Sequence, residues 1–300
     1  MLQYFAYGLG IHSNLALPEF IPQNTACDVT ITLQPPGPAP EPLPEMRQYL
    51  KISPQETIVA IQDIGIFHIR AGREILVTPF PESEERLIQL CIAGSIMAIL
   101  LYQRGCPLLL HASAIALNNQ VVCILGNSGD GKSSTAAAFI AKGHRIISDD
   151  VVPIQITPST IHVVPAYPQI KISPEIATAF DYPPEQLSFL HPRLGEYAYR
   201  SLTQFDATPA PLSRIYVLND SDTLSIERLP PQTAMVEMIR HSYGLQPFGP
   251  ALDRALHLST CTQLLNHVSV CRLNRPRSIP LLAEVVRCIE SDVLQAVSTS

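Results

Sequence analysis

The run GNSGDGKS at residues 126–133 has the spacing G-x-x-x-x-G-K-[ST] of a phosphate-binding loop. Glycines let such a loop curl so that successive amides point at phosphate oxygens, and the following helix adds the positive end of its dipole. Lys132 is expected to reach the β- and γ-phosphates of a nucleoside triphosphate, and Ser133 to bind magnesium. A purely structural turn is the alternative, but an apolar strand precedes this loop and an alanine-rich helix follows it. ATP and Mg2+ are therefore the expected ligands, with contacts from Gly126, Asn127, Ser128, Gly129, Asp130, Gly131, Lys132, Ser133 and Ser134.

Two adjacent carboxylates, Asp149 and Asp150, follow the loop after one helix and one strand. The helix should begin near Lys132 and end at Gly143, and residues 145–148 should return as a strand beside the strand before the loop. The acidic pair would then lie at the edge of the sheet that carries the loop. A metal needs at least one carboxylate and an attacking hydroxyl needs a base, so the pair could divide these tasks. Capping of a turn is the alternative.

These groups need a mixed α/β scaffold, and the periodicity of the chain indicates one. Residues 1–80 alternate short β-like runs with turn-forming residues, which predicts a small, largely antiparallel sheet. From residue 83, a serine, an acidic turn and apolar residues at helical spacing begin a long helix. We therefore expect an N-terminal mainly β domain over residues 1–82 and an α/β catalytic domain over residues 83–300.

The remaining segments give weaker signals. Residues 34–45 contain six prolines, which predicts an exposed extended loop or, as the alternative, a docking segment for a proline-recognising partner. Strands are expected over residues 213–219 and 223–229, and helices around 232–241, 252–266 and 279–293. Lys171 and Arg200 are candidates to stabilise a transferred phosphoryl group, with ordinary surface positions as the alternative.

Composition excludes several classes of protein. The net charge of −6 and the scattered basic residues argue against a nucleic-acid partner. Residues 87–102 are apolar but short for a membrane span, so a buried core helix is expected, and no signal peptide is evident. No histidine or cysteine spacing predicts a structural zinc site. The odd number and wide spacing of the cysteines predict buried reduced thiols and a cytoplasmic location, at Cys27, Cys91, Cys106, Cys123, Cys261, Cys271 and Cys288.

The stretch GNSGDGKSSTAAAFIAKGHRIISDDVVPI, preceded by LLLHASAI, resembles the catalytic domain of HPr kinase/phosphorylase and of HPr kinase-like proteins. The resemblance implies a P-loop kinase domain similar to that of phosphoenolpyruvate carboxykinases, in which ATP and magnesium serve to phosphorylate a serine hydroxyl. It implies that Asp149 is the general base, that Asp150 is its acidic, metal-binding neighbour, and that His111 is an active-site histidine. Ser134 departs from the family, which typically has a glutamate there, and no later glutamate-arginine-glycine signature occurs.

The opening YFAYGLGIHSNLALPEF is similar to the leader of HPr kinase-like proteins from peptide natural-product clusters, including lasso-peptide tail kinases. The sequence thus favours a kinase that acts on a serine of a protein or peptide. A small-molecule hydroxyl kinase, a non-catalytic nucleotide sensor and a plain ATPase are the alternatives. Members of the family often form oligomers, so a homo-oligomer is a further expectation.

Overall fold

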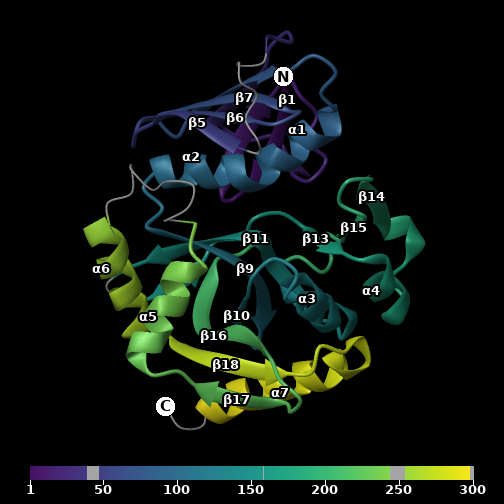
Figure 1. Cartoon of the computed structure of the whole chain (residues 1–300), viewed down its shortest axis with the longest axis vertical. Coiled ribbons are helices and arrows are strands. Elements are labelled where there is room, and N and C mark those ends of the chain that lie inside the picture. The colour runs from purple at the N-terminus through teal and green to yellow at the C-terminus, as the bar shows by residue number, and fades with distance from the viewer. Residues whose placement is uncertain (39–46, 158, 244–253, 298–300) are drawn as a thin grey trace.

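The computed structural model describes residues 1–38, 47–157, 159–243 and 254–297. The chain has a mixed α/β fold, as predicted, and its described residues form three sheets (Figure 1). Only residues 34–38 of the proline-rich segment are fully placed, and the predicted loop otherwise lies outside the described residues. Gln34 and Gly37 donate backbone hydrogen bonds to Val77 and Pro79, so this part runs in extended form along a neighbouring strand.

The N-terminal strands form one eight-stranded sheet in the order β3-β1-β2-β4-β8-β7-β6-β5. The sheet is antiparallel except at the pairs β2–β4 and β4–β8, which are parallel. The alternation of buried and partly buried residues, clearest along β8, leaves one face of the sheet to be covered. The strands are β1 Leu2–Ala6, β2 Leu9–Ser13, β3 Ile21–Pro22, β4 Val29–Leu33, β5 Arg47–Ile52, β6 Glu56–Ile61, β7 Gly65–Arg70 and β8 Glu74–Pro79.

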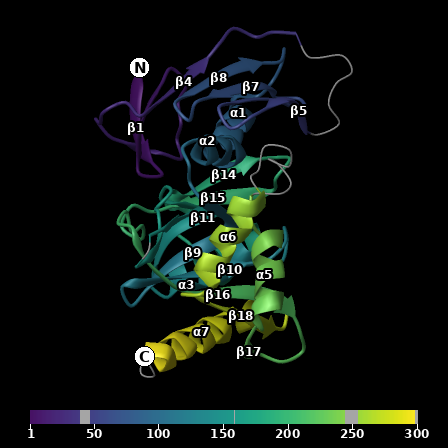
Figure 2. The same ribbon diagram turned by 90° about the vertical axis from the view of Figure 1, so that its left-hand side faces the viewer.

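A continuous helical segment lies between this sheet and the rest of the molecule (Figures 1 and 2). It consists of α1 Glu85–Cys91, a π-helical turn η1 Ile92–Ile96 and α2 Met97–Gln103. By length and mean hydropathy of 1.5 it could cross a membrane, but 61% of its apolar window is buried within the fold. Its side chains share one apolar cluster with the N-terminal strands, as in a core helix. The predicted domain boundary after residue 82 falls just before α1, and the division itself stays a prediction.

The larger sheet has the order β10-β9-β11-β12-β16-β18-β17, and β16 also pairs with β10. Alternate residues of β10 point to opposite faces. Val122 and Ile124 pack with α3 and α7, whereas Val121 and Cys123 pack with α5 and α6. The strands are β9 Leu108–Leu117, β10 Gln120–Leu125, β11 Arg145–Ile156, β12 Ile161–Val163, β16 Ala210–Asp220, β17 Ser225–Arg228 and β18 Ser269–Arg275, and the helices are α3 Lys132–Ala141, α5 Pro231–Arg240, α6 Arg254–Leu265 and α7 Leu282–Val297, which follows the short turn η3 Ile279–Leu281.

A third sheet of three strands lies beside α3 in the order β13-β15-β14. The sequence did not predict it, nor did it predict β18. These strands are short, and turn-forming residues surround them. The elements are β13 Gln169–Ile172, α4 Pro174–Ala179, η2 Pro184–Gln186, β14 Leu187–His191 and β15 Glu196–Arg200.

Two detailed expectations are wrong. The strand after α3 does not lie beside β10, because β9 separates β10 from β11 and is antiparallel to both. Asn118 and Asn119, with φ of 52° and 62°, make the tight turn that folds β9 back onto β10. β9 therefore occupies the edge of β10 where the strand after α3 was expected. The thiols are all free, but Cys27 is exposed, and full burial holds only for Cys123, Cys261 and Cys271.

Candidate active site

The glycine-rich loop connects β10 to α3 and is folded tightly on itself. Gly129 and Gly131 have φ of +84° and +92°, a left-handed conformation that side chains disfavour. Lys132 Nζ donates hydrogen bonds of 2.9 and 3.0 Å to the carbonyls of Gly126 and Asn127. The lysine side chain thus closes the loop on itself, and the binding of a phosphate there stays a prediction.

Register across β9 brings the acidic pair level with this loop. Ser113 and Ala112 pair with the last two residues of β10 on one side and with Asp149 and Asp150 on the other. β11 runs on to Ile156, so the pair lies within a strand and not at its end. The pair is nevertheless level with the start of the loop, because β10 ends at that point.

Asp149 is the carboxylate that contacts the loop. It is buried and accepts hydrogen bonds from Ser113 Oγ at 2.6 Å, from Ser133 Oγ at 3.2 Å and from the backbone amide of Lys171 at 3.2 Å. Burial raises the pKa of Asp149, the charge of Asp150 raises it further, and the bond from Ser113 opposes this. Asp149 therefore connects the loop serine to β9 and β13.

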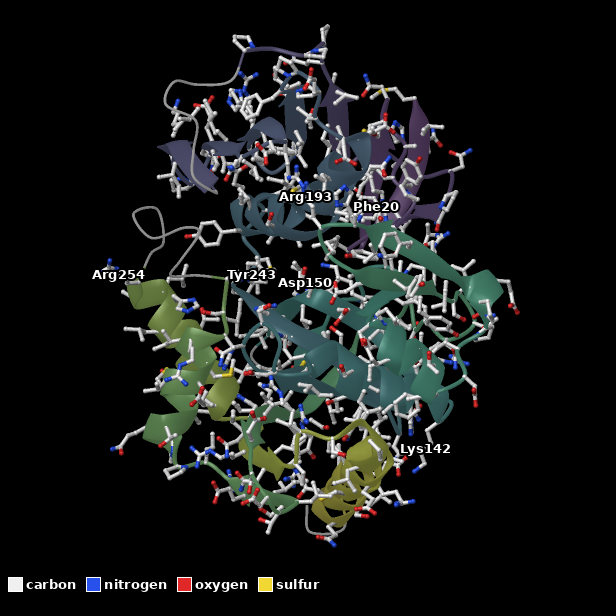
Figure 3. The ribbon with its side chains drawn as sticks, turned by 45° about the vertical axis from the view of Figure 1, so that its right-hand side comes forward. Phe20, Lys142, Asp150, Arg193, Tyr243 and Arg254 are labelled. Atoms are coloured by element: carbon white, nitrogen blue, oxygen red, sulfur yellow. The ribbon has the colours of Figure 1, made fainter. Side chains whose placement is uncertain are left out.

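Asp150 has φ of 76°, which turns its side chain toward a different set of partners. It accepts a hydrogen bond of 3.1 Å from Lys171 Nζ and one of 3.0 Å from the Tyr243 hydroxyl, and lies 3.3 Å from His111 Nε2. Figure 3 shows Asp150 between the two halves of the molecule, with Tyr243 nearby.

Electrostatics within this group are dominated by one ion pair. Burial opposes ionisation of Asp150, but Lys171 and His111 outweigh it and lower the pKa of Asp150 to about 2. The pKa of Lys171 is raised, chiefly by Asp150. Burial lowers the pKa of His111, so its imidazole is neutral near pH 7 and Lys171 supplies the main positive charge.

The loop and the acidic pair share one cavity of about 410 Å³. Of the predicted residues, Gly126 is not among those that line this cavity, and Asn127 and Asp130 line a second cavity of about 350 Å³. The first cavity is lined by His111, Ser128, Gly129, Gly131, Lys132, Ser133, Ser134, Asp149, Asp150, Lys171, Ser173, Leu194 and Glu196.

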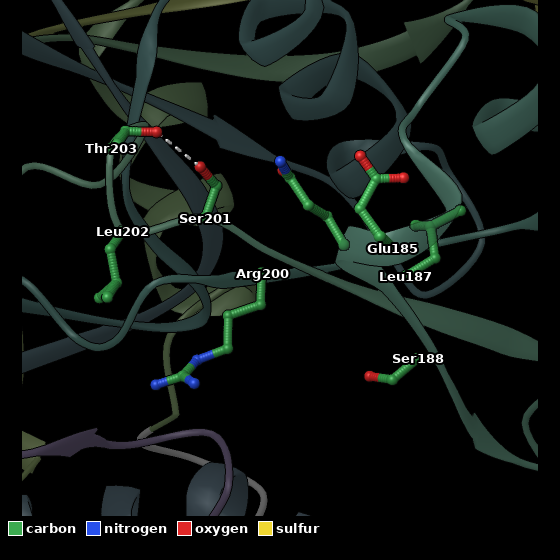
Figure 4. Close-up of a pocket in the computed structure, with 8 residues that line it drawn as sticks. Glu185, Leu187, Ser188, Arg200, Ser201, Leu202 and Thr203 are labelled. Carbon is green, nitrogen blue, oxygen red and sulfur yellow. Dashed lines mark hydrogen bonds between the residues drawn. The ribbon is translucent and has the colours of Figure 1, made fainter.

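Arg200, the other predicted cation, is not in this group. Its guanidinium donates to the carbonyl of Phe20 at 2.9 Å, and the residue lines a separate cavity of about 470 Å³ (Figure 4). Sequence reasoning missed Ser113 and Tyr243. Ser113 lies two residues after His111 on the same face of β9, and this alternation could have indicated it. Nothing in the local sequence marks Tyr243.

Two arginines, one at the end of β18 and one just after it, were also missed, although they hold the loop. Arg275 donates to the carbonyl of Asp130, and Arg277 donates to the carbonyl of Gly129. A Cβ at Gly131 would lie 2.7 Å from Arg275 Nη2, so the close approach of this guanidinium requires a glycine. The arginines bind carbonyls and so leave the loop amides alone, but the amides of Asn127 and Asp130 already donate within the loop, to Asp130 Oδ2 and to the carbonyl of Asn127.

The donor set fits magnesium bound with a nucleotide better than a resident metal. Within the described parts of the chain, no group of three or more histidine, cysteine, aspartate and glutamate side chains could hold a metal ion. Magnesium typically uses one or two carboxylates together with substrate phosphates and water. Asp149, Asp150 and the Ser133 hydroxyl beside the loop meet that requirement.

Comparisons with known proteins give a limited likeness. The chain matches no protein-family model, and no curated protein matches it in sequence. Among solved structures it is similar to the Hpr(Ser) kinase/phosphatase from Coxiella burnetii, with a TM-score of 0.35 and 15% identity. The match covers 63% of this chain and 97% of that one. The chemistry of the site therefore rests on its own geometry.

Proposed function

We propose that this chain is an ATP- and Mg2+-dependent kinase that transfers the γ-phosphate to a hydroxyl group, with a serine of a protein or peptide as the acceptor. The observation that carries this proposal is the contact of Asp149 with Ser133 in a cavity that also holds Lys132, Lys171 and Asp150. Phosphate binding, metal binding and acceptor activation are thereby available within one site.

On the phosphate side, the loop amides would bind the β- and γ-phosphates, and Lys132 would exchange its two carbonyl partners for phosphate oxygens. The Ser133 hydroxyl, which donates to Asp149, would turn its oxygen lone pairs to the metal. Magnesium held there would neutralise charge on the phosphates. We assign Asp149 to this side, the reverse of the expectation from sequence, because Asp149 and not Asp150 contacts Ser133.

On the acceptor side, Asp150 would accept the hydrogen bond of the attacking hydroxyl and take its proton. Its low pKa is compatible with this role, because phosphoryl transfer has a loose transition state in which orienting the nucleophile matters more than base strength. Lys171 would move from Asp150 to the transferring phosphoryl group and stabilise its charge. While Lys171 moves, His111 and Tyr243 would hold the Asp150 carboxylate in place.

The Asp150–Lys171 pair also favours a kinase over a nucleotide sensor, since binding alone requires the loop but no base. The seven free thiols support a reducing compartment, and we propose the cytoplasm.

The experiment is a transfer assay with γ-labelled ATP and Mg2+. Each serine-bearing peptide is paired with the same peptide carrying alanine, and wild type is compared with Asp150→Asn. Label in the serine peptide only, and with wild type only, supports the proposal. Label in a small molecule, hydrolysis that persists in the variant, or tight binding without turnover would replace it with a small-molecule kinase, an ATPase or a sensor, respectively.

A further inference from the structure

The turn between β1 and β2 has an unusual residue at its tip. Tyr7 and Gly8 have φ of 57° and 72°, so both are left-handed, as in the tight two-residue turns of hairpins. Glycine and asparagine normally occupy such positions, and a bulky aromatic residue there is strained. Strain of this kind persists where surrounding contacts enforce it, and it is often connected with function.

The contacts of Tyr7 join two segments from distant parts of the chain. Its backbone amide donates to the carbonyl of Ala166 at 3.1 Å, and its hydroxyl donates to the carbonyl of Ala93 at 2.8 Å. Its ring meets that of Tyr167 edge-on, with centroids 5.8 Å apart. Tyr7 is 3% exposed, so these bonds are shielded from water.

Ala93 belongs to the π-helical turn η1, which lies beside the acidic pair. π-helical turns are rare in proteins as a whole, and those that occur often lie at functional sites. A Cβ added to Gly94, the next residue, would lie only 3.4 Å from Asp150 Oδ2. This is an ordinary contact distance, so the turn lies directly beside the Asp150 carboxylate.

Ala166 belongs to the segment that leads into β13. Its amide donates to the carbonyl of Ile147 in β11, and β13 then carries Lys171. Lys171 contacts Asp149 through its backbone amide and Asp150 through its ammonium group. The two segments bound by Tyr7 thus support both members of the Asp150–Lys171 pair.

We infer that Tyr7 is a positioning residue for phosphoryl transfer and that the N-terminal hairpin is a working part of the active site. This inference rests on the proposed kinase function for its kinetic consequence, but its structural consequence can be measured without it. Tyr7 touches neither the nucleotide loop nor the cavity, so it would act on the turnover rate and not on nucleotide affinity.

The chain offers a matched control in Tyr4, also in this hairpin. Tyr4 is buried, and its hydroxyl accepts a hydrogen bond of 3.1 Å from the amide of Leu17, within the N-terminal sheet region. We expect Tyr7→Phe to lower kcat about tenfold with an unchanged KM for ATP, because the buried carbonyl of Ala93 loses its donor. Tyr4→Phe should keep the wild-type kcat.

Hydrogen exchange provides the readout that does not require activity. In Tyr7→Phe, the amides of residues 92–97 and 164–171 should exchange faster than in Tyr4→Phe, with no change at residues 126–134. If the two variants exchange alike over those residues, or if both leave kcat unchanged, the inference is overturned. If wild type transfers no phosphate at all, the proposed function fails, and the exchange comparison alone decides the role of Tyr7.

Discussion

Replacing Asp149 and Asp150 singly with asparagine should separate nucleotide binding from phosphoryl transfer. Asp149 contacts the loop serine, so Asp149→Asn should weaken binding of Mg2+ with ATP about 10- to 100-fold, the usual effect of losing a group that orients a metal ligand. In the proposed mechanism Asp150 takes the proton of the acceptor hydroxyl, so Asp150→Asn should leave that affinity within about twofold and lower transfer about 10²- to 10⁴-fold, as for loss of a general base.

The two variants should also differ in stability. The pKa of Asp150 falls from 3.8 to about 2 through its interactions in the folded protein, and the carboxylate is 25% exposed. At about 1.4 kcal/mol per pKa unit, this corresponds to about 2 kcal/mol of folding free energy. A depressed carboxyl pKa stabilises the fold above pH 4 and loses its effect as the pH falls to about 2. Asp149, whose pKa is raised, gives no such stabilisation.

Isothermal titration calorimetry measures the affinity for ATP with Mg2+, and the transfer assay measures the rate of phosphoryl transfer. Urea unfolding at several pH values measures the free energy of unfolding. Asp150→Asn should be about 2 kcal/mol less stable than wild type at pH 7, and the two should converge toward pH 2. Asp149→Asn should unfold close to wild type at pH 7. The opposite pattern, with intact metal-dependent binding in Asp149→Asn and lost binding in Asp150→Asn, would refute our division of roles.

Three further predictions concern the loop and its surroundings. Lys132→Ala should weaken ATP binding about 100-fold in calorimetry and abolish transfer, since about two charge-assisted hydrogen bonds are lost; near-normal affinity would contradict this. Arg277→Ala should weaken ATP binding about 5- to 10-fold without changing the melting temperature, because this exposed side chain holds the Gly129 carbonyl; unchanged affinity would exclude that role. Burial lowers the pKa of His241 to about 4, so the fold should lose stability, by about 3 kcal/mol, as the pH falls from 6.5 to 4. In His241→Gln, urea unfolding should show a smaller loss of stability over that pH range, and a loss equal to that of wild type would refute this role of His241.

Local patterns in the sequence were enough to predict the loop and several elements around it. The loop depends on glycines at fixed positions and on residues in direct succession, so its geometry is encoded within a few residues. The helix after the loop, predicted to end at Gly143, is α3, and the predicted helix around residues 232–241 is α5. The spacing of apolar residues also indicated a mixed α/β chain. Apolar residues recur at a different spacing in a strand than in a helix, so a short stretch of sequence is enough to tell the two apart.

The partners of the acidic pair depended on strand order and on one backbone angle. Asp149 and Asp150 are neighbours in sequence, but adjacent strand residues point to opposite faces, and the φ of 76° at Asp150 changes its direction again. Neither β9 as the intervening strand nor Lys171 as the common partner follows from the spacing after the loop.

The more distant contributors were decided entirely by tertiary structure. Tyr243 reaches Asp150 across 93 residues, Arg275 reaches the loop across 145, and Tyr7 reaches the turn behind Asp150 across 86. Such contacts form only when separate elements pack together, and a single tyrosine or arginine has no local pattern that distinguishes it from a surface residue. The sequence therefore determined the glycine-rich loop by itself, whereas packing decided which carboxylate contacts it and which residues hold both in place.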